Sequence, residues 1–249
     1  MTFKEIDVVY YIFYGGALSA NIHGLALTYV LLKEDYKRNL WVVLANLCYL
    51  VCSILSFYQS SFDCATVSYI VKVLEILGTI LQVLTPLFRA QKLMIKQLKV
   101  VCTILSIGLI VFTFLKLNNL NYQCDLPDKG LLILSDEVVA EVFSSVFSVL
   151  LYIISYMTIL KVVYGSAFLK TNAKMQIIKK VSIYAMTFAV VAEISNTVLI
   201  MYKKDHTGLV LYLRSQIVLL LMVSQFSVEL AKKMTKNSIQ KPESNDVRL

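Results

Sequence analysis

Charge is what this sequence has little of. Only 16% of its 249 residues are Asp, Glu, Lys or Arg, whereas 58% are hydrophobic. In a soluble domain about a quarter of the residues are charged, and the domain needs a polar surface to stay in solution. The charges here are too few to cover a water-facing surface, which excludes an ordinary soluble protein. We therefore expect the excess apolar side chains to face a lipid bilayer.

Other scarce features exclude further classes. Three prolines and eight glycines exclude a disordered or loop-rich chain. The two histidines, His23 and His206, cannot assemble a metal site with the cysteines. No Gly-rich phosphate loop, zinc motif or serine nucleophile elbow is present, and no Ser/His or His/Asp constellation converges at one depth. We expect no enzyme, no catalytic residue, no metal and no cofactor.

Long apolar runs are what is present. A helix needs about 20 residues to cross about 30 Å of hydrocarbon, and transmembrane strands would be shorter and would alternate polar with apolar residues. The sequence predicts an all-α membrane protein, a seven-transmembrane helix bundle over residues 1–232, with a largely disordered cytoplasmic tail at 233–249. The expected spans are residues 6–32, 40–57, 65–88, 100–117, 138–163, 181–202 and 209–230.

The basic residues orient this bundle. The net charge is +8, but no basic stripe with interleaved aromatics indicates nucleic acid as a partner. Cytoplasmic loops of membrane proteins carry an excess of Lys and Arg, so we expect the N-terminus outside, the C-terminus in the cytoplasm, and a multi-pass protein of the plasma membrane. The basic clusters follow the first, third, fifth and seventh spans, at residues 33–38, 89–99, 170–180 and 232–248.

Two of the five cysteines lie on the expected outer side. Cys64 is at the outer end of the third span and Cys124 is in the long loop before the fifth. That side is oxidising, so a disulfide can form and persist there. We expect Cys64 and Cys124 to be bonded, which would hold the loop over the mouth of the bundle; the alternative is two unpaired thiols.

Charged residues inside spans are costly and tend to be functional. Lys72 and Glu75 lie three residues apart on one face of the third span. Glu193 and Arg214 lie in the outer halves of the sixth and seventh spans, where an ion pair would neutralise both charges. Two interpretations are compatible with each other: a clasp that holds the helices together, and a polar contact for a ligand.

A disulfide from the top of the third helix to the second external loop, in a seven-helix chain with its N-terminus outside, resembles the G-protein-coupled receptors. From Cys64 to Arg89 is 89 − 64 = 25 residues, about 37 Å of helix. This is similar to the family's third helix, whose characteristic arginine docks against the G protein. Asn21 and the pair Leu44-Ala45 also lie where the family carries an Asn and a Leu-Ala pair.

The chain resembles a divergent member of this family, of the kind found among invertebrate chemoreceptors. The acidic-Arg-Tyr triplet of the family is Phe88-Arg89-Ala90 here, and the seventh span has no Asn-Pro-x-x-Tyr. The resemblance implies that Arg89 couples to a heterotrimeric G protein; the alternative is an ordinary inside-positive anchor. It also implies that the third, sixth and seventh helices converge. The four charges above would then ring an outer cavity that binds a small ligand, with Tyr69 and Tyr212 at its rim.

The first span has a face of small residues. Gly16, Ala20 and Gly24 recur every four residues, which lets another helix approach closely. The sequence leaves two alternatives open for this face, packing inside the bundle and a homodimer through the first helix.

Three functions remain open. A receptor would bind a ligand outside and present its basic loops to a cytoplasmic partner. A transporter or channel usually has paired repeats and broken helices at mid-membrane, whereas here only Pro86 interrupts a span, near its inner end. A non-signalling scaffold is the third alternative. The sequence favours the receptor.

Overall fold

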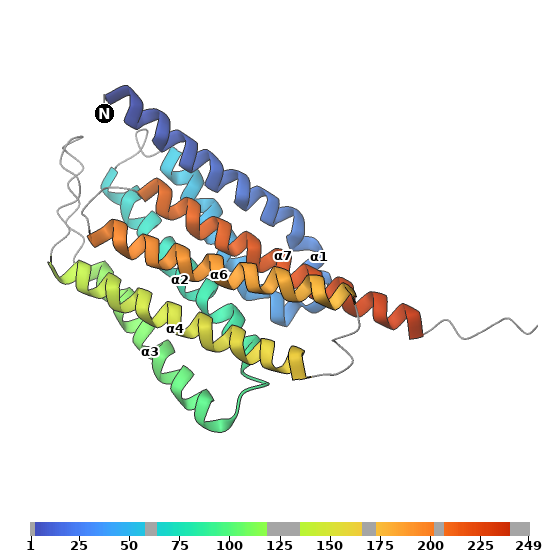
Figure 1. Ribbon diagram of the computed structural model, residues 1–249. Coiled ribbons are helices and arrows are strands. Elements are labelled where there is room, and N and C mark those ends of the chain that lie inside the picture. Colours follow the sequence, from blue (N-terminus) through green and yellow to red (C-terminus); the bar gives the residue numbers. More distant parts are fainter. Residues whose placement is uncertain (1–2, 58–63, 119–134, 166–172, 202–206, 240–249) are drawn as a thin grey trace, which may run out of the picture.

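Every secondary-structure element that the structure, a computed structural model, describes is a helix. The described residues are 3–57, 64–118, 135–165, 173–201 and 207–239, and none of them forms a strand. They make the helices of Figure 1: α1 (Phe3–Phe57), α2 (Cys64–Ala90), α3 (Lys96–Asn118), α4 (Ser135–Gly165), α6 (Ala173–Met201) and α7 (Thr207–Ile239).

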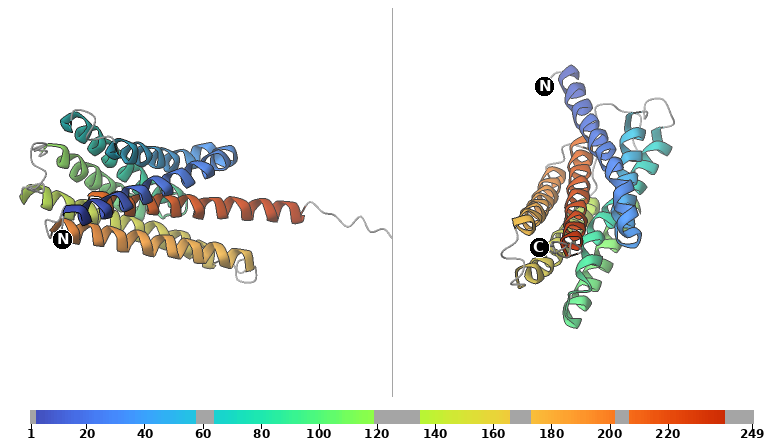
Figure 2. Two further views of the ribbon diagram at one scale, coloured as in Figure 1. Left: turned by 90° about the horizontal axis from the view of Figure 1, so that it is seen from above. Right: turned by 90° about the vertical axis from the view of Figure 1, so that its right-hand side faces the viewer.

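α1 carries the first two predicted spans in one continuous helical element, whereas the sequence predicted a break between residues 32 and 40. The two halves nevertheless lie side by side (Figures 1 and 2), since Asn46 Nδ2 donates a hydrogen bond to Asn21 O at 3.1 Å. In a straight helix those 25 residues would span about 37 Å. The chain therefore turns back within α1. At the turn, Asn39 Nδ2 donates to Leu31 O at 2.7 Å.

Six stretches of the described residues are long and apolar enough to cross a membrane. The sixth predicted span corresponds to α6, whose apolar run Ile183–Val198 is shorter. Apolar side chains more than half exposed stand on the outward faces of α3, α4 and α6, where only lipid can cover them favourably; they include Ile104, Ile107, Met157, Tyr184 and Val191. The protein is embedded in a membrane. The six stretches are Ile12–Lys33, Asn39–Ser56, Tyr69–Ala90, Lys96–Leu115, Val139–Lys161 and Leu209–Ser227.

α2 lies in the middle of the bundle. It packs against α1, α3, α4 and α7, while α6 lies between α4 and α7, and α1 packs against α7. The fully buried core draws on these elements, with Tyr49 of α1, Val83 of α2, Leu151 of α4 and Val218 of α7. Any polar side chain on the inward faces of α2 therefore meets several helices at once.

One end of the bundle carries exposed lysines. α1 begins at one end, and α7 finishes at the other, where it extends beyond its neighbours (Figure 2). Exposed lysines gather at this second end, which we call the basic end: Lys33 in the turn of α1, Lys92 after α2, Lys96 at the start of α3 and Lys161 near the end of α4. α7 continues to Ile239, so residues 233–239 of the predicted tail are helical; residues 240–249 lie outside the described residues.

The small-residue face of the first span packs inside the bundle. A Cβ atom on Gly16 would lie 2.8 Å from Cε2 of Tyr212, and one on Gly24 would lie 2.7 Å from Cγ of Asn46. Ala20, between them, is buried. Glycine at these positions lets α7 and the second half of α1 approach closely. A homodimer through the first helix stays a prediction, and it would have to use another face.

Candidate functional site

Polar side chains of α2 form one line along the helix. Lys72, Glu75, Thr79, Gln82 and Arg89 follow one another at intervals of three, four, three and seven residues, which places them on a single face. Because α2 is central, this face meets α1, α4 and α7. The line runs from the half of α2 opposite the basic end down to the basic end itself.

Arg214 of α7 is buried against this face, with 3% of its surface exposed. Its Nε lies 3.8 Å from Glu75 Oε1 of α2, and its Nη2 lies 3.7 Å from Glu141 Oε1 of α4. Its Nη1 also donates a hydrogen bond to Thr79 Oγ1. Lys72 Nζ lies 3.4 Å from the other oxygen of Glu75. The guanidinium is thus shared by carboxylates from two different helices, as its fork of donors allows.

α6 contributes a third carboxylate. Glu193 is 2% exposed and interacts electrostatically with Arg214. One turn further along α6, Asn196 Nδ2 donates to Glu141 Oε1 at 3.2 Å. These contacts join α2, α4, α6 and α7 through one group of charges. We call Lys72, Glu75, Glu141, Glu193 and Arg214 the Arg214 cluster.

The cluster lies at one level of the bundle. Arg214 is seven residues into α7, Glu141 is six residues into α4, and Glu193 is eight residues from the end of α6. At 1.5 Å per residue these positions lie about 9–12 Å below the end opposite the basic end. With every group ionised, the cluster holds two positive and three negative charges, a net charge of 2 − 3 = −1.

A chain of hydrogen bonds leads from the cluster toward the basic end. Thr79, which accepts from Arg214, lies 3.2 Å from the hydroxyl of Tyr49. Tyr49 donates to Gln82 Oε1 at 3.0 Å, and Gln82 Nε2 donates to the hydroxyl of Tyr152 at 2.8 Å. All four are buried. We call Arg214, Thr79, Tyr49, Gln82 and Tyr152 the polar column.

Arg89 continues the line at the basic end. Its Nη2 donates to Asn39 Oδ1 at 2.7 Å, and Asn39 in turn holds Leu31 O at the turn of α1. Arg89 also interacts electrostatically with Tyr156, which lies one turn beyond Tyr152 on α4. The arginine that the sequence singled out for coupling is therefore bonded within the chain and ties α2 to α1.

No protein-family model, no curated protein and no solved structure matches this chain. What the protein does must be inferred from its own residues.

The structure gathers four of the predicted ligand-binding residues, namely Lys72, Glu75, Glu193 and Arg214. The two predicted rim tyrosines are placed differently. Tyr212 packs its ring against Gly16 and lies 5.9 Å from the ring of Phe13, and Tyr69 is half-exposed. Their assignment to a ligand site stays a prediction.

The predicted disulfide lies outside the described residues, because Cys124 falls in the segment between α3 and α4 and the side chain of Cys64 is not described. In the described part of the chain, Cys48, Cys52 and Cys102 are free thiols. No group of three or more His, Cys, Asp or Glu among the described residues is placed to hold a metal ion.

Glu141 is the main site residue that the sequence did not single out. It lies near the start of the predicted fifth span and opens a polar stripe on α4 that continues through Ser145, Ser148, Tyr152 and Ser155. This spacing of three and four residues places the polar side chains on one face of the helix. Because polar side chains are unfavourable against lipid, the pattern could have indicated that this face, Glu141 included, points into the bundle.

Proposed function

We propose that the protein is a seven-transmembrane receptor that binds a small extracellular ligand at the Arg214 cluster and signals to a cytoplasmic partner, a heterotrimeric G protein. The observation that carries the proposal is the polar column, which runs from the buried charges at one end of the bundle to Tyr152. One turn beyond Tyr152 on α4, Tyr156 interacts electrostatically with Arg89 at the basic end. Ionisable residues kept inside a membrane at this cost are functional by default.

The proposed orientation places the cluster on the outer side. The exposed lysines of the basic end favour the cytoplasm, which puts the N-terminus outside, the C-terminus inside and Arg89 next to the cytoplasmic partner. The plasma membrane is the compartment in which such a receptor meets an extracellular ligand.

The charge of the cluster favours a positively charged ligand. The cluster contains three carboxylates and two cations. Carboxylates attract a positively charged group by their Coulomb interaction with it. A ligand that carries a small ammonium group would be drawn to these carboxylates, and it would compete with Arg214 for Glu75 and Glu141.

Binding in this way changes the contacts among four helices. A ligand shifts a conformational equilibrium only when it binds one state better than the other. An ammonium group drawn to Glu141 would favour a state in which α4 and α6 are released from Arg214. Thr79 and Tyr49 contact that guanidinium or its partner directly, and Gln82 carries the change to Tyr152. Through Tyr156, which lies one turn beyond Tyr152 on α4 and interacts electrostatically with Arg89, the change would then reach Arg89 and release it from Asn39.

The proposal is tested by recruitment of a labelled Gα subunit that lacks its own membrane anchor to cells that express the protein. Glu141→Gln weakens the cluster, and we expect it to raise ligand-free recruitment above that of the unchanged chain. Adding Arg89→Ala should abolish that rise, whereas Lys92→Ala, which removes an exposed charge from the same end, should preserve it. Equal recruitment by all four proteins, across a panel of Gα subunits, would remove the proposal's support.

A transporter or channel is the second candidate, because the polar column also offers a line of hydrogen-bonding groups inside the bundle, and buried ionisable groups mark ion pathways. Substrate or ion flux in proteoliposomes that contain only this protein would favour it. A non-signalling scaffold would show neither flux nor recruitment and would co-purify with a stable partner.

A further inference from the structure

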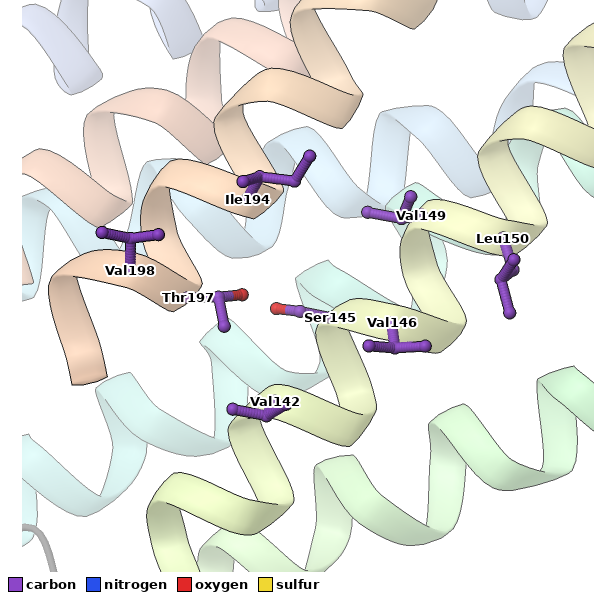
Figure 3. Close-up of a pocket in the computed structure, with 8 residues that line it drawn as sticks. All are labelled: Val142, Ser145, Val146, Val149, Leu150, Ile194, Thr197 and Val198. Carbon is purple, nitrogen blue, oxygen red and sulfur yellow. The ribbon is translucent and has the colours of Figure 1, made fainter.

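A separate cavity lies between α4 and α6 on the outside of the bundle (Figure 3). Its volume is about 240 Å³, and its lining is almost entirely aliphatic. Five of its lining residues come from consecutive turns of α4, and the other three come from α6. The lining residues are Val142, Ser145, Val146, Val149, Leu150, Ile194, Thr197 and Val198.

The cavity opens toward lipid. Val146, Leu150, Ile194 and Val198, which line it, are each about 40–52% exposed on the outward faces of α4 and α6. Both helices belong to the apolar surface that the bilayer covers. A molecule dissolved in the hydrocarbon can therefore enter without passing through the Arg214 cluster.

One hydroxyl group that lines the cavity, that of Ser145, has no hydrogen-bond partner among the described residues. Ser145 is 4% exposed, and its Oγ makes no hydrogen bond to any residue that the structure describes. Figure 3 shows the hydroxyl directed across the cavity toward Thr197, whose own Oγ1 donates to Glu193 O at 2.9 Å. Buried hydroxyl groups normally find a partner, so the cavity holds a hydrogen-bonding site that the chain itself leaves open.

The depth of Ser145 limits what the partner can be. Ser145 lies six residues beyond Val139, where the span begins, which is about 9 Å into the hydrocarbon at 1.5 Å per residue. The polar part of a phospholipid stays at the interface, and its acyl chain has no hydrogen-bonding group to offer at this depth. A charged group is strongly disfavoured there. The partner must therefore be neutral and small enough to bring its polar group inside the membrane.

We propose that this cavity binds a neutral, bilayer-dissolved small molecule with an aliphatic body and a single hydroxyl group, of the medium-chain alcohol type, whose oxygen hydrogen-bonds to Ser145. A cavity of 150 Å³ accommodates benzene, so 240 Å³ holds about ten non-hydrogen atoms by the same ratio. 1-Nonanol has that size. The site is distinct from the Arg214 cluster, and its occupation does not depend on any signalling role.

The test uses the full chain in nanodiscs of saturated phosphatidylcholine and a nonanol that carries a photoreactive diazirine. We expect saturable labelling of α4 and α6 residues that line the cavity, identified by mass spectrometry and displaced by unlabelled 1-nonanol. Ser145→Ala should raise the half-displacing concentration of 1-nonanol about fivefold, the worth of one hydrogen bond. It should leave displacement by nonane, which has no hydroxyl, unchanged.

Two further variants separate binding from folding. Ser155→Ala removes a second buried hydroxyl of α4 that makes no hydrogen bond to a described residue, outside the cavity lining, and should leave displacement by 1-nonanol unchanged. Val149→Phe fills the cavity and should abolish labelling, with Val142→Phe as a second filling variant. Labelling that is not saturable, displacement by 1-nonanol that Ser145→Ala leaves unaltered, or equal protection by a phospholipid with a photoinert acyl chain would each overturn the proposal.

Discussion

Replacing Arg214 by leucine is the most direct way to test the buried charge cluster. The substitution removes the cation that lies 3.8 Å from Glu75 and 3.7 Å from Glu141, and it also removes a hydrogen bond to Thr79. It leaves the buried carboxylates of Glu141 and Glu193 and the partly buried carboxylate of Glu75 with Lys72 as the one cation of the cluster. Breaking a buried ion pair by removing one partner costs about 3–5 kcal/mol. We therefore expect Arg214→Leu to destabilise the fold by about that amount.

Two buried thiols allow this loss of stability to be measured. Cys52 and Cys102 are both fully buried, so a thiol-reactive fluorophore reports their exposure when detergent-solubilised protein unfolds on heating. A domain of 150–250 residues loses about 2–4 °C of Tm for each kcal/mol. The expected decrease in Tm is therefore about 6–20 °C, the product of those two ranges.

The direction in which a second substitution changes Tm provides the sharper test. In the unchanged chain, Glu141→Gln removes a partner of Arg214 and should lower Tm. In the Arg214→Leu background, the same substitution removes a carboxylate that has lost its cation and should raise Tm. Double-mutant cycles measure such coupling between neighbouring groups. The control is Ser155→Ala, which removes a buried hydroxyl of the same helix α4 and should shift Tm by the same small amount in both backgrounds.

The reasoning would be refuted if Arg214→Leu and the unchanged chain melted within about 2 °C of each other, less than the loss expected for a single kcal/mol. It would equally be refuted if Glu141→Gln lowered Tm by the same amount in both backgrounds. Either result would mean that the carboxylates do not depend on the guanidinium for their stability in the bundle.

Three further outcomes are expected. Gly24→Ala should lower Tm by the equivalent of about 1–3 kcal/mol, because its Cβ would collide with the facing asparagine amide, while Gly15→Ala, with nothing within 4 Å, should leave Tm equal or slightly higher in the same thiol assay. Asn39→Ala removes two hydrogen bonds at the turn of α1. It should lower the free energy of unfolding by about 1–3 kcal/mol, measured as a lower Tm. If Cys64 and Cys124 are bonded, alkylation of the denatured chain should modify three of the five cysteines without reductant and all five after reduction, resolved as gel shifts.

The membrane spans were predictable because they depend on one short-range quantity, the length of apolar chain that crosses hydrocarbon. The predicted third span at residues 65–88 corresponds to α2 (Cys64–Ala90), and the predicted fourth at 100–117 corresponds to α3 (Lys96–Asn118). The helices are longer than the apolar runs at several ends, because a helix satisfies its own backbone hydrogen bonds and continues into water where hydropathy no longer marks it.

The turn within α1 was not predictable in the same way. Lys33, Lys37 and other polar residues between the two apolar runs indicated a loop, yet the helical element continues through them. What reverses the chain is a contact distant in sequence, between Asn46 of the second half and the backbone of Asn21 in the first. Hydropathy contains no information about such a pairing, and the small residue Gly24, which allows the close approach, was interpreted only as a packing surface.

In the candidate site, too, features within one helix were predictable and contacts between helices were not. Each charge was visible as a costly residue within a span, and the pairing of Lys72 with Glu75 follows from their spacing on one helix. The partners of Arg214 come from helices whose neighbours the sequence does not specify. Glu193 was predicted to pair with Arg214 because both lie at a similar depth. Glu141 lies at the same level and was not considered.

The position of α2 explains why its polar line matters more than the individual charges do. A polar stripe on a peripheral helix has one neighbour to bond with, whereas α2 packs against α1, α3, α4 and α7. Thr79 on this stripe is bonded to α7 and lies next to the hydroxyl of Tyr49 in α1, and Gln82 bonds α1 and α4. A displacement of α7 at Arg214 therefore cannot leave the bonds of α1 and α4 unchanged. That coupling through one central helix is a physical requirement for any function in which an event at one end of the bundle is detected at the other.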